Sequence, residues 1–467
     1  MATRYQVSRT FLYEQRNHLA AQMEGLFGVA GPKVVTTQHL KEQELRLMLK
    51  LRLEGRCSLS AISSMLEELN MPYCSTGYIS QHLRQTGEQL PNIVEWQGSV
   101  VFASDEIFYL GRRPILITVE VCSGAILQME MLPSLTKEAW EMHWKRLREK
   151  GILPLKSISD EGWVMAAARE QLQEPWQPDT FHAVSYRLGE FARRLERQVE
   201  KAFEYACQRQ SRSQNAKSPK VRQSTEQQAQ QAQQAFEQAY AQLQDFRFLY
   251  HCILKQNDAF LPQLGAVRNR CEAEAEVSLA IECLRSLNIA GLDKALDEVQ
   301  NILPQLYQFL DSAAQATAEL QAQLGEHLLP FFTHAWLCEQ KARKVKNNAS
   351  YRKRKLAEAQ LALNLLQEHY QMSTEDFQAF TCTIFQQLDI ACAQSSAMVE
   401  TVNSFVRPFL DDSRDQPSQA LLNLIMFYWN HRTFLRGKRK GKAPMEILSG
   451  SHLNKNWLDL LLEQVQA

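Results

Sequence analysis

Two aspartates stand where a metal site could form. Asp105 lies in VVFASDEIFYL and Asp160 lies in SISDEG, each near the C-terminal end of an apolar, β-prone segment. Aspartate is a poor strand former, and open α/β folds build their sites at the carboxyl ends of strands. Two adjacent carboxylates repel each other unless a cation lies between them. Because no Cys or His stands beside them, the oxygen donors favour Mg²⁺ or Mn²⁺ over zinc.

Glu400 is the candidate for a third carboxylate. It stands in SSAMVETVNSF, which has helical periodicity, and no Lys or Arg stands four residues to either side of it. The helix is predicted to bury one stripe and to present a polar face next to it. The stripe comprises Val399, Val402, Val406 and Phe409, and the polar face comprises Ser396, Glu400, Asn403, Ser404 and Arg407. A third carboxylate would complete a two-metal site of the kind that catalyses in-line phosphoryl displacement.

Each of these acids also has a structural alternative. An aspartate at a strand end often caps the next turn, and Asp160 could be the N-cap of a following helix. Other acids could supply the third ligand, although none of them combines a helix with such a polar stripe. These rivals are Asp376, Asp389, Asp411 and Asp412.

An α/β domain is expected around the two aspartates. β-prone runs occupy 98–110, two segments of 114–132 around a Ser-Gly turn, 153–162 and 178–184, and helical patterns occupy 136–151 and 163–172. The order strand, strand, strand, helix, strand, helix, strand predicts a mixed sheet, with three meandering strands followed by parallel additions. The first and fourth strands, which carry Asp105 and Asp160, can then lie side by side.

The remaining sequence is mainly helical. Helices at 59–69 and 76–87 flank a short turn, and the second has Ser80, Gln81, Arg84 and Gln85 on its free face, as a DNA recognition helix would. Ordinary packing of two helices explains the pair equally well. The segment 6–21 could end another such unit. No convincing strand appears from 185 to about 376, a region that includes the basic stretch 341–355.

These motifs together resemble the DDE transposases, whose catalytic domain has a ribonuclease H-like fold. The matching segments are FASDEIFY, SISDEGW, DTFHAVSYRL, SSAMVETVNSFVRPFL, YWNHRTF and GKAPMEIL, within 98–192 and 380–450. The resemblance implies an α/β catalytic core with a ribonuclease H-like mixed sheet, a large all-α insertion and an all-α helix-turn-helix region. The implied boundaries are 1–95 for DNA binding, 96–192 and 377–450 for the split catalytic domain, 193–376 for the insertion and 451–467 for a helical tail.

The resemblance also implies a reaction. Asp105, Asp160 and Glu400 would bind two Mg²⁺ or Mn²⁺ ions and support nicking of DNA at a transposon end. The freed 3′-hydroxyl would then attack target DNA, with no covalent protein intermediate. The spacing of 240 positions (400 minus 160) resembles subgroups with a helical insertion before the last catalytic helix. The expected partners are transposon-end DNA with terminal inverted repeats, target DNA, and further copies of the chain in a homodimer or larger synaptic complex.

Other residues are candidates for DNA contacts. His182 could approach the site to contact phosphate, or be a structural histidine. Trp336 could stack on a base, or be a core residue. Runs of basic residues suit phosphate contacts but are usually just solvated surface. The DNA-binding candidates are Arg84, Asn403, Arg407, Arg432, Arg436, Lys438, Arg439, Lys440 and Lys442. The opposing hypothesis is a catalytically inactive or domesticated DNA-binding protein or regulator that keeps the fold as a scaffold.

Composition sets the remaining expectations. The chain has 467 residues, and 52 Lys and Arg balance 52 Asp and Glu, so only the distribution of charge can indicate a partner. The ten cysteines form no CxxC pair and no Cys/His cluster at zinc spacing, which favours free thiols in a reducing compartment. No apolar run approaches the roughly 20 residues of a membrane span. We therefore expect a cytoplasmic, nucleoid-associated protein with no membrane partner.

Overall fold

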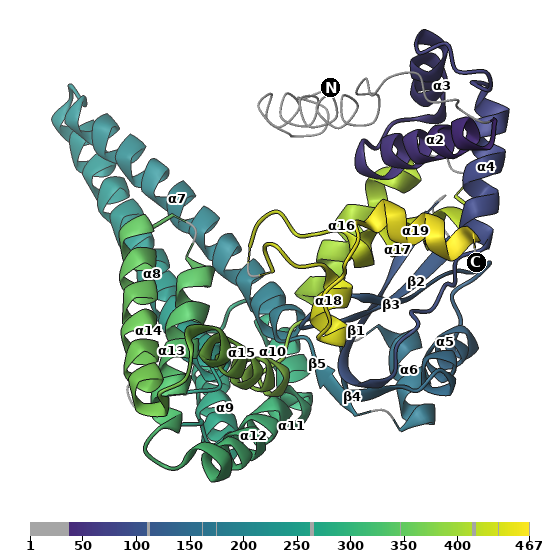
Figure 1. Cartoon of the computed structure of the whole chain (residues 1–467). Coiled ribbons are helices and arrows are strands. Elements are labelled where there is room, and N and C mark those ends of the chain that lie inside the picture. The colour runs from purple at the N-terminus through teal and green to yellow at the C-terminus, as the bar shows by residue number, and fades with distance from the viewer. Residues whose placement is uncertain are drawn as a thin grey trace. The chain divides into compact units, whose positions relative to one another are not determined.

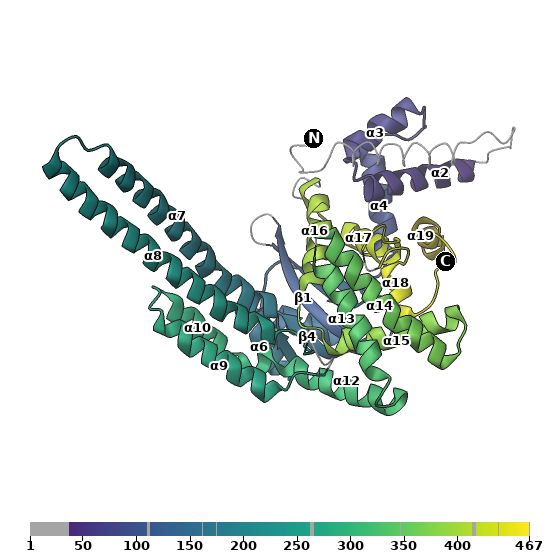
Figure 2. The same ribbon diagram turned by 90° about the vertical axis from the view of Figure 1, so that its left-hand side faces the viewer.

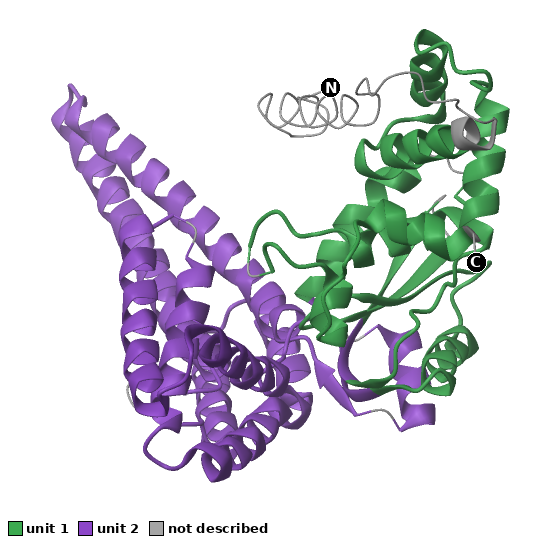
Figure 3. Cartoon of the chain, viewed as in Figure 1, with its two compact units in different colours: residues 1–99, 104–153, 397–467 green, residues 100–103, 154–396 purple. Residues whose placement is uncertain are grey.

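The structure is a computed structural model, shown in Figures 1 and 2. It describes residues 37–109, 113–160, 162–173, 175–261, 266–345, 347–412, 417–437 and 439–466. The helix expected at 6–21 and the DNA-contact candidate Lys438 lie outside these ranges. None of the helices in the described ranges is long and apolar enough to cross a membrane. The chain divides into two compact units (Figure 3). Unit 1 comprises residues 1–99, 104–153 and 397–467, and unit 2 comprises residues 100–103 and 154–396.

A mixed sheet of five strands lies among the helices, in the order β3-β2-β1-β4-β5. Strands β2 and β3 pair antiparallel with Ile115 opposite Met131, and β4 and β5 pair parallel with Ser157 opposite Trp176. This agrees with the expected α/β core, including the adjacency of the first and fourth strands. The strands are β1 (Gly98–Tyr109), β2 (Arg113–Glu120), β3 (Ile126–Met131), β4 (Ile152–Ser159) and β5 (Trp176–Pro178).

The prediction of a fifth strand over 178–184 is wrong beyond its first residue. Strand β5 ends at Pro178, and Phe181–Tyr186 forms a short π-helix, η2. The Asp179 carboxylate accepts a hydrogen bond of 2.7 Å from the backbone N–H of Phe181, and so caps the start of that helix. An apolar run of this length fits a buried helix as well as a strand, which is why periodicity alone misassigned it.

The helices of unit 1 include the predicted helix pair near the N-terminus. Ser58 and Ser75 cap α3 and α4 by accepting hydrogen bonds from the backbone N–H groups of Ala61 and Tyr78. The helices of unit 1 are α2 (Thr37–Leu49), η1 (Lys50–Glu54), α3 (Leu59–Glu68), α4 (Thr76–Glu88), α5 (Lys137–Glu149), α16 (Ala397–Asp412), α17 (Gln419–His431), α18 (Pro444–Ser449) and α19 (Trp457–Gln466).

Helices of unit 1 contact both faces of β1. Successive side chains of a strand point to opposite faces. The Ser104 hydroxyl accepts a hydrogen bond from Trp144 of α5, and the next residue, Asp105, accepts one from Asn403 of α16. Helix α17 binds the edge strand β3, because its Asn430 amide both donates to the carbonyl of Ile126 and accepts from its N–H. The outward-facing backbone groups of Ile126 on this edge strand are thereby satisfied.

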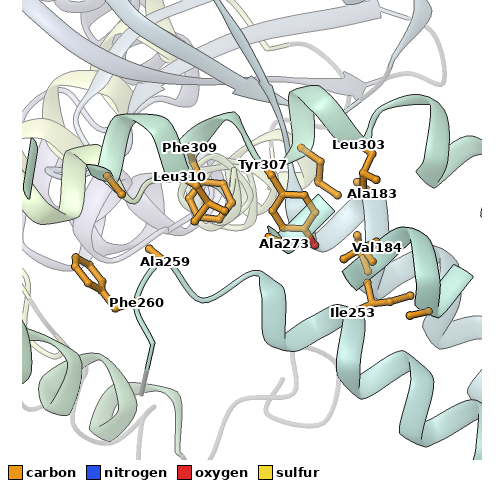
Figure 4. Packing of buried hydrophobic residues seen from close by; sticks show 14 of the residues in the cluster. Ala183, Val184, Ile253, Ala259, Phe260, Ala273, Leu303, Tyr307, Phe309 and Leu310 are labelled. Carbon is orange, nitrogen blue, oxygen red and sulfur yellow. The ribbon is translucent and has the colours of Figure 1, made fainter. Parts of the chain in front are cut away.

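Unit 2 is largely helical. The described part of 185–376 contains no strand, and its one β-structure is an isolated bridge between Phe260 and Val267. Helices α7 and α8 form a long pair (Figure 2). The core of this unit includes Tyr307, Val184 and Ile253 (Figure 4). Its helices are α6 (Trp163–Leu172), η2, α7 (Arg187–Gln214), α8 (Pro219–Gln256), α9 (Arg270–Ser286), α10 (Leu292–Asn301), α11 (Leu303–Leu306), α12 (Gln308–Leu324), α13 (Leu329–Lys344), α14 (Ala349–Tyr370) and α15 (Thr374–Ala391).

Candidate active site

Asp105 is held between its own strand and helix α16. Its Oδ1 accepts a hydrogen bond of 2.9 Å from the backbone N–H of Glu106, and its Oδ2 accepts one of 2.6 Å from Asn403 Nδ2. The second bond joins residues 298 positions apart. Unit 1 therefore brings α16 next to β1, although residues 154–396 of unit 2 lie between these two elements in the sequence.

Asn403 is the residue that makes this link, and its side chain is only 3% exposed. Its amide is buried and donates to Asp105, which gives it a positioning role, and the contact with DNA stays a prediction. Its Oδ1 is also buried and has no hydrogen-bond partner among the described residues. A buried acceptor without a partner is costly, so this oxygen suits a polar ligand such as a water bound to a metal ion.

Glu400 lies one turn before Asn403 on α16 and is exposed. Residues three apart on a helix share one side, so Glu400 lies on the side of α16 that carries the link to Asp105. The predicted stripe of Val399, Val402, Val406 and Phe409 is buried. The predicted polar face is only partly correct. Glu400, Ser404 and Arg407 are exposed, whereas Ser396 and Asn403 are buried.

A second buried carboxylate fixes the residue that precedes α16. Asp179 is 2% exposed, and its Oδ2 accepts hydrogen bonds from the backbone N–H of Ser396, at 2.6 Å, and from the Ser396 hydroxyl. Its other oxygen caps η2, so the carboxylate has partners on both oxygens. The sequence signal for this role was an aspartate directly after the proline that ends β5.

Asp160 is exposed and directly follows the last residue of β4. Its Oδ1 accepts a hydrogen bond of 3.1 Å from the backbone N–H of Gly162, the residue before α6. This bond caps the turn after β4 and occupies one carboxylate oxygen. The alternative that Asp160 is itself the N-cap of α6 is wrong, because Gly162 holds that position. Asp160 belongs to unit 2, whereas Asp105 and Glu400 belong to unit 1. That Asp160 joins the other two acids stays a prediction.

The donor set in unit 1 fits a hard divalent cation. Asp105 and Glu400 offer carboxylate oxygens, and Asn403 adds a buried amide oxygen close to Asp105. Oxygen donors of this kind are those that Mg²⁺ and Mn²⁺ prefer, and thiolate or imidazole would favour zinc.

Two of the rival acids, Asp389 and Asp376, have structural roles. Asp389 accepts hydrogen bonds from Trp336 Nε1 at 3.1 Å and from Gln340 at 2.8 Å. Asp376 accepts a hydrogen bond from the hydroxyl of Ser373, the cap of α15. Burial raises the pKa of Asp412, which lies near Arg52. These contacts favour Glu400 as the third candidate.

The two accessory candidates fit the structural alternatives that the sequence left open. Trp336 is 7% exposed and its ring contacts Phe260, so it is a core residue and the base-stacking interpretation is wrong. His182 lies within η2. It is half-buried and its ring contacts those of Phe181 and Tyr186.

The basic candidates divide into exposed residues and residues that have roles within the fold. Arg84, Arg407, Arg436, Lys440 and Lys442 are exposed and remain available for phosphate contacts.

Two other arginines have roles within the fold. The Arg432 guanidinium packs over the rings of Phe405 and Trp429, at 4.3 and 4.4 Å from their centroids. Arg439 donates hydrogen bonds to the backbone carbonyls of Cys122 and Val121, which anchors the basic loop to the end of β2. Their assignment as DNA contacts is therefore weakened, because the guanidinium groups already serve packing and anchoring.

Trp163 was missed in the sequence. It is the first residue of α6, three positions after Asp160, and it is 80% exposed. Val164, Met165 and Ala168 form the buried side of α6, so a large indole standing outside that stripe was the available signal. An exposed indole is suited to stacking on nucleic acid bases.

Comparison with known proteins identifies no relative: no family model matches the chain, and no curated protein matches it in sequence.

Proposed function

We propose that the chain is a DNA transposase of the DDE type, with a ribonuclease H-like catalytic core that the helical insertion interrupts. The observation that supports this best is the hydrogen bond from Asn403 to Asp105. It places an acidic strand residue against the helix that carries Glu400, across a long insertion. A shared catalytic site would explain why the chain brings α16 into contact with β1.

The proposed chemistry is metal-dependent phosphoryl transfer. Asp105, Asp160 and Glu400 would hold two Mg²⁺ or Mn²⁺ ions, which supply an activated attacking oxygen and stabilise the leaving oxygen. Asn403 fixes the rotamer of Asp105, so that this carboxylate is preorganised before DNA binds. Arg407, one turn after Asn403 and exposed, is suited to bind the DNA backbone.

The proposed partners are transposon-end DNA and target DNA. Helix α4 presents Ser80, Gln81, Arg84 and Gln85 to solvent, as a recognition helix requires. Arg436, Lys440 and Lys442 add exposed positive charge. Since both ends of an element must be handled together, we propose a homodimer or larger synaptic complex that acts on DNA in the nucleoid.

A cleavage assay tests this function. End-labelled duplexes cut from the DNA that flanks the gene are incubated with the full chain and Mg²⁺. We expect strand cleavage that falls by roughly 10³-fold or more in D105N, D160N and E400Q. The matched control is D411N, which removes an exposed acid from the same helix as Glu400. DNA binding without cleavage, unchanged by D105N, would instead support the non-catalytic DNA-binding protein.

A further inference from the structure

Three possible metal ligands meet in unit 2, between helices α13 and α14. Cys338 Sγ lies 3.5 Å from His334 Nε2 and 3.6 Å from Glu358 Oε2. All three ligand atoms lie within 4.8 Å of one another. Cys338 is 2% exposed, Glu358 is half-buried and His334 is exposed.

The packing of the two helices explains why these side chains meet. His334 and Cys338 are four positions apart and therefore share one side of α13. Ala335, Cys338, Ala359 and Ala362 form a small buried cluster in which α13 and α14 contact each other. Small side chains let the helix backbones approach closely, so Glu358 of α14 comes within reach of the Cys338 thiol. The ligands thus stand on two packed helices rather than on a loop.

The spacing fits tetrahedral coordination. A zinc ion is bound at about 2.3 Å by sulfur and about 2.0 to 2.2 Å by nitrogen or oxygen, which for tetrahedral angles separates the ligand atoms by about 3.5 Å. The two measured separations from Cys338 Sγ agree with this value. Thiolate, imidazole and carboxylate together are a donor set for zinc rather than for Mg²⁺.

We propose that His334, Cys338 and Glu358 form a Zn²⁺ site. The fourth position falls to water, since His334 opens the cluster to solvent. This site does not depend on the proposed transposase function. It differs from the expectation that the sequence has no Cys/His cluster at zinc spacing, because a His and a Cys four positions apart on one helix were not considered there.

Two features of the cluster bear on metal binding. The Lys355 ammonium forms an ion pair with Glu358 Oε2, and Zn²⁺ would take its place. Burial raises the pKa of the Cys338 thiol above its ordinary value. Metal binding therefore displaces the thiol proton to solvent, because the thiolate is the ligand.

The test is a titration of the full-length protein with Zn²⁺, and with Co²⁺ as a spectroscopic probe. We expect one thiolate-to-cobalt charge-transfer absorption, which Zn²⁺ abolishes by displacement. C338S should lose the absorption, and H334A should weaken metal binding by roughly 10-fold or more. H334A alters an exposed side chain, so its fold should be intact. K355Q should bind more tightly because a competing cation is gone.

The control is C382S, which removes an exposed cysteine of α15. It should bind cobalt as the unaltered protein does. An absorption that survives in C338S, or that is absent from the unaltered protein, would overturn the proposal, as would unchanged affinity in both H334A and K355Q. Carboxylate-only binding at the proposed catalytic acids gives no thiolate absorption and is distinguished by that criterion.

Discussion

Asn403 shows how one side chain can unite distant parts of a chain. Its amide donates to Asp105, while its Oδ1 is buried without a partner among the described residues. An ordinary core position would satisfy both ends of the amide. The arrangement suggests that a ligand bound at the proposed catalytic acids completes the hydrogen bonding.

Replacing Asn403 tests this positioning role. N403A should lower the DNA cleavage rate by roughly 10- to 100-fold with little change in DNA affinity, because the Asp105 carboxylate loses the group that orients it. N403D should be worse, since it places a second carboxylate beside Asp105. The control is S404A, an exposed neighbour on α16. Equal cleavage by N403A and the unaltered protein would show that Asp105 needs no such orientation.

Trp163 is a residue whose exposure calls for an explanation. W163A should change the free energy of unfolding by no more than about 0.5 kcal/mol, since the indole is 80% exposed. The free energy of binding of W163A to single-stranded DNA should be less favourable by about 1 to 3 kcal/mol, which is the contribution of one stacked base. W163F should restore most of that affinity. Unchanged binding by W163A, measured by fluorescence anisotropy, would exclude a stacking role.

At the scale of elements, helix α5 carries a buried histidine that makes the stability of unit 1 depend on pH. His143 is fully buried, and its Nε2 lies 3.0 Å from Thr118 Oγ1. Burial lowers the pKa of His143 below its ordinary value, although Glu130 opposes this effect. The folded protein therefore binds a proton at this site less readily than the unfolded chain does.

The sign of the effect follows from linkage. The contribution of His143 to stability is fully present above the unfolded pKa of about 6.5 and is lost as the pH falls below it, by at most about 1.4 kcal/mol per pH unit. Denaturant unfolding between pH 7 and pH 5 should show this loss, and H143Q should show a shallower one. Equal pH slopes for H143Q and the unaltered protein would contradict the assignment.

Much of the element pattern was predictable from the sequence. Three features could be read from residues that are close together in the sequence. They are the β-prone run around Asp105, the Ser-Gly turn between β2 and β3, and the apolar stripe of α16. The end of β5 was not predictable, because the apolar residues after Pro178 are compatible with either a strand or a helix. The Asp179 side chain favours the helix by capping its start. The burial of Asn403 was not predictable either, because its side chain contacts Asp105 of β1, which lies 298 positions earlier in the sequence.

At the scale of the whole molecule, charge and connectivity limit what the chain can do. Equal numbers of basic and acidic residues leave no net attraction for DNA, so the proposed DNA binding would depend on local groups such as Arg436, Lys440 and Lys442. The insertion divides the proposed catalytic domain in sequence, but Asp105 and α16 meet within unit 1. This connectivity suggests that both catalytic segments must be present for the proposed acids to act together.

The decisive measurement is strand transfer by the full chain. Pre-cut duplexes with the flanking DNA of the gene, ending in either a 3′-hydroxyl or a 3′-hydrogen, are incubated with a target plasmid and Mg²⁺. The proposed mechanism predicts covalent joints only from the 3′-hydroxyl substrate, and none with E400Q, because that hydroxyl is the attacking group. Joining by the 3′-deoxy substrate, or joining by E400Q at the unaltered rate, would contradict it.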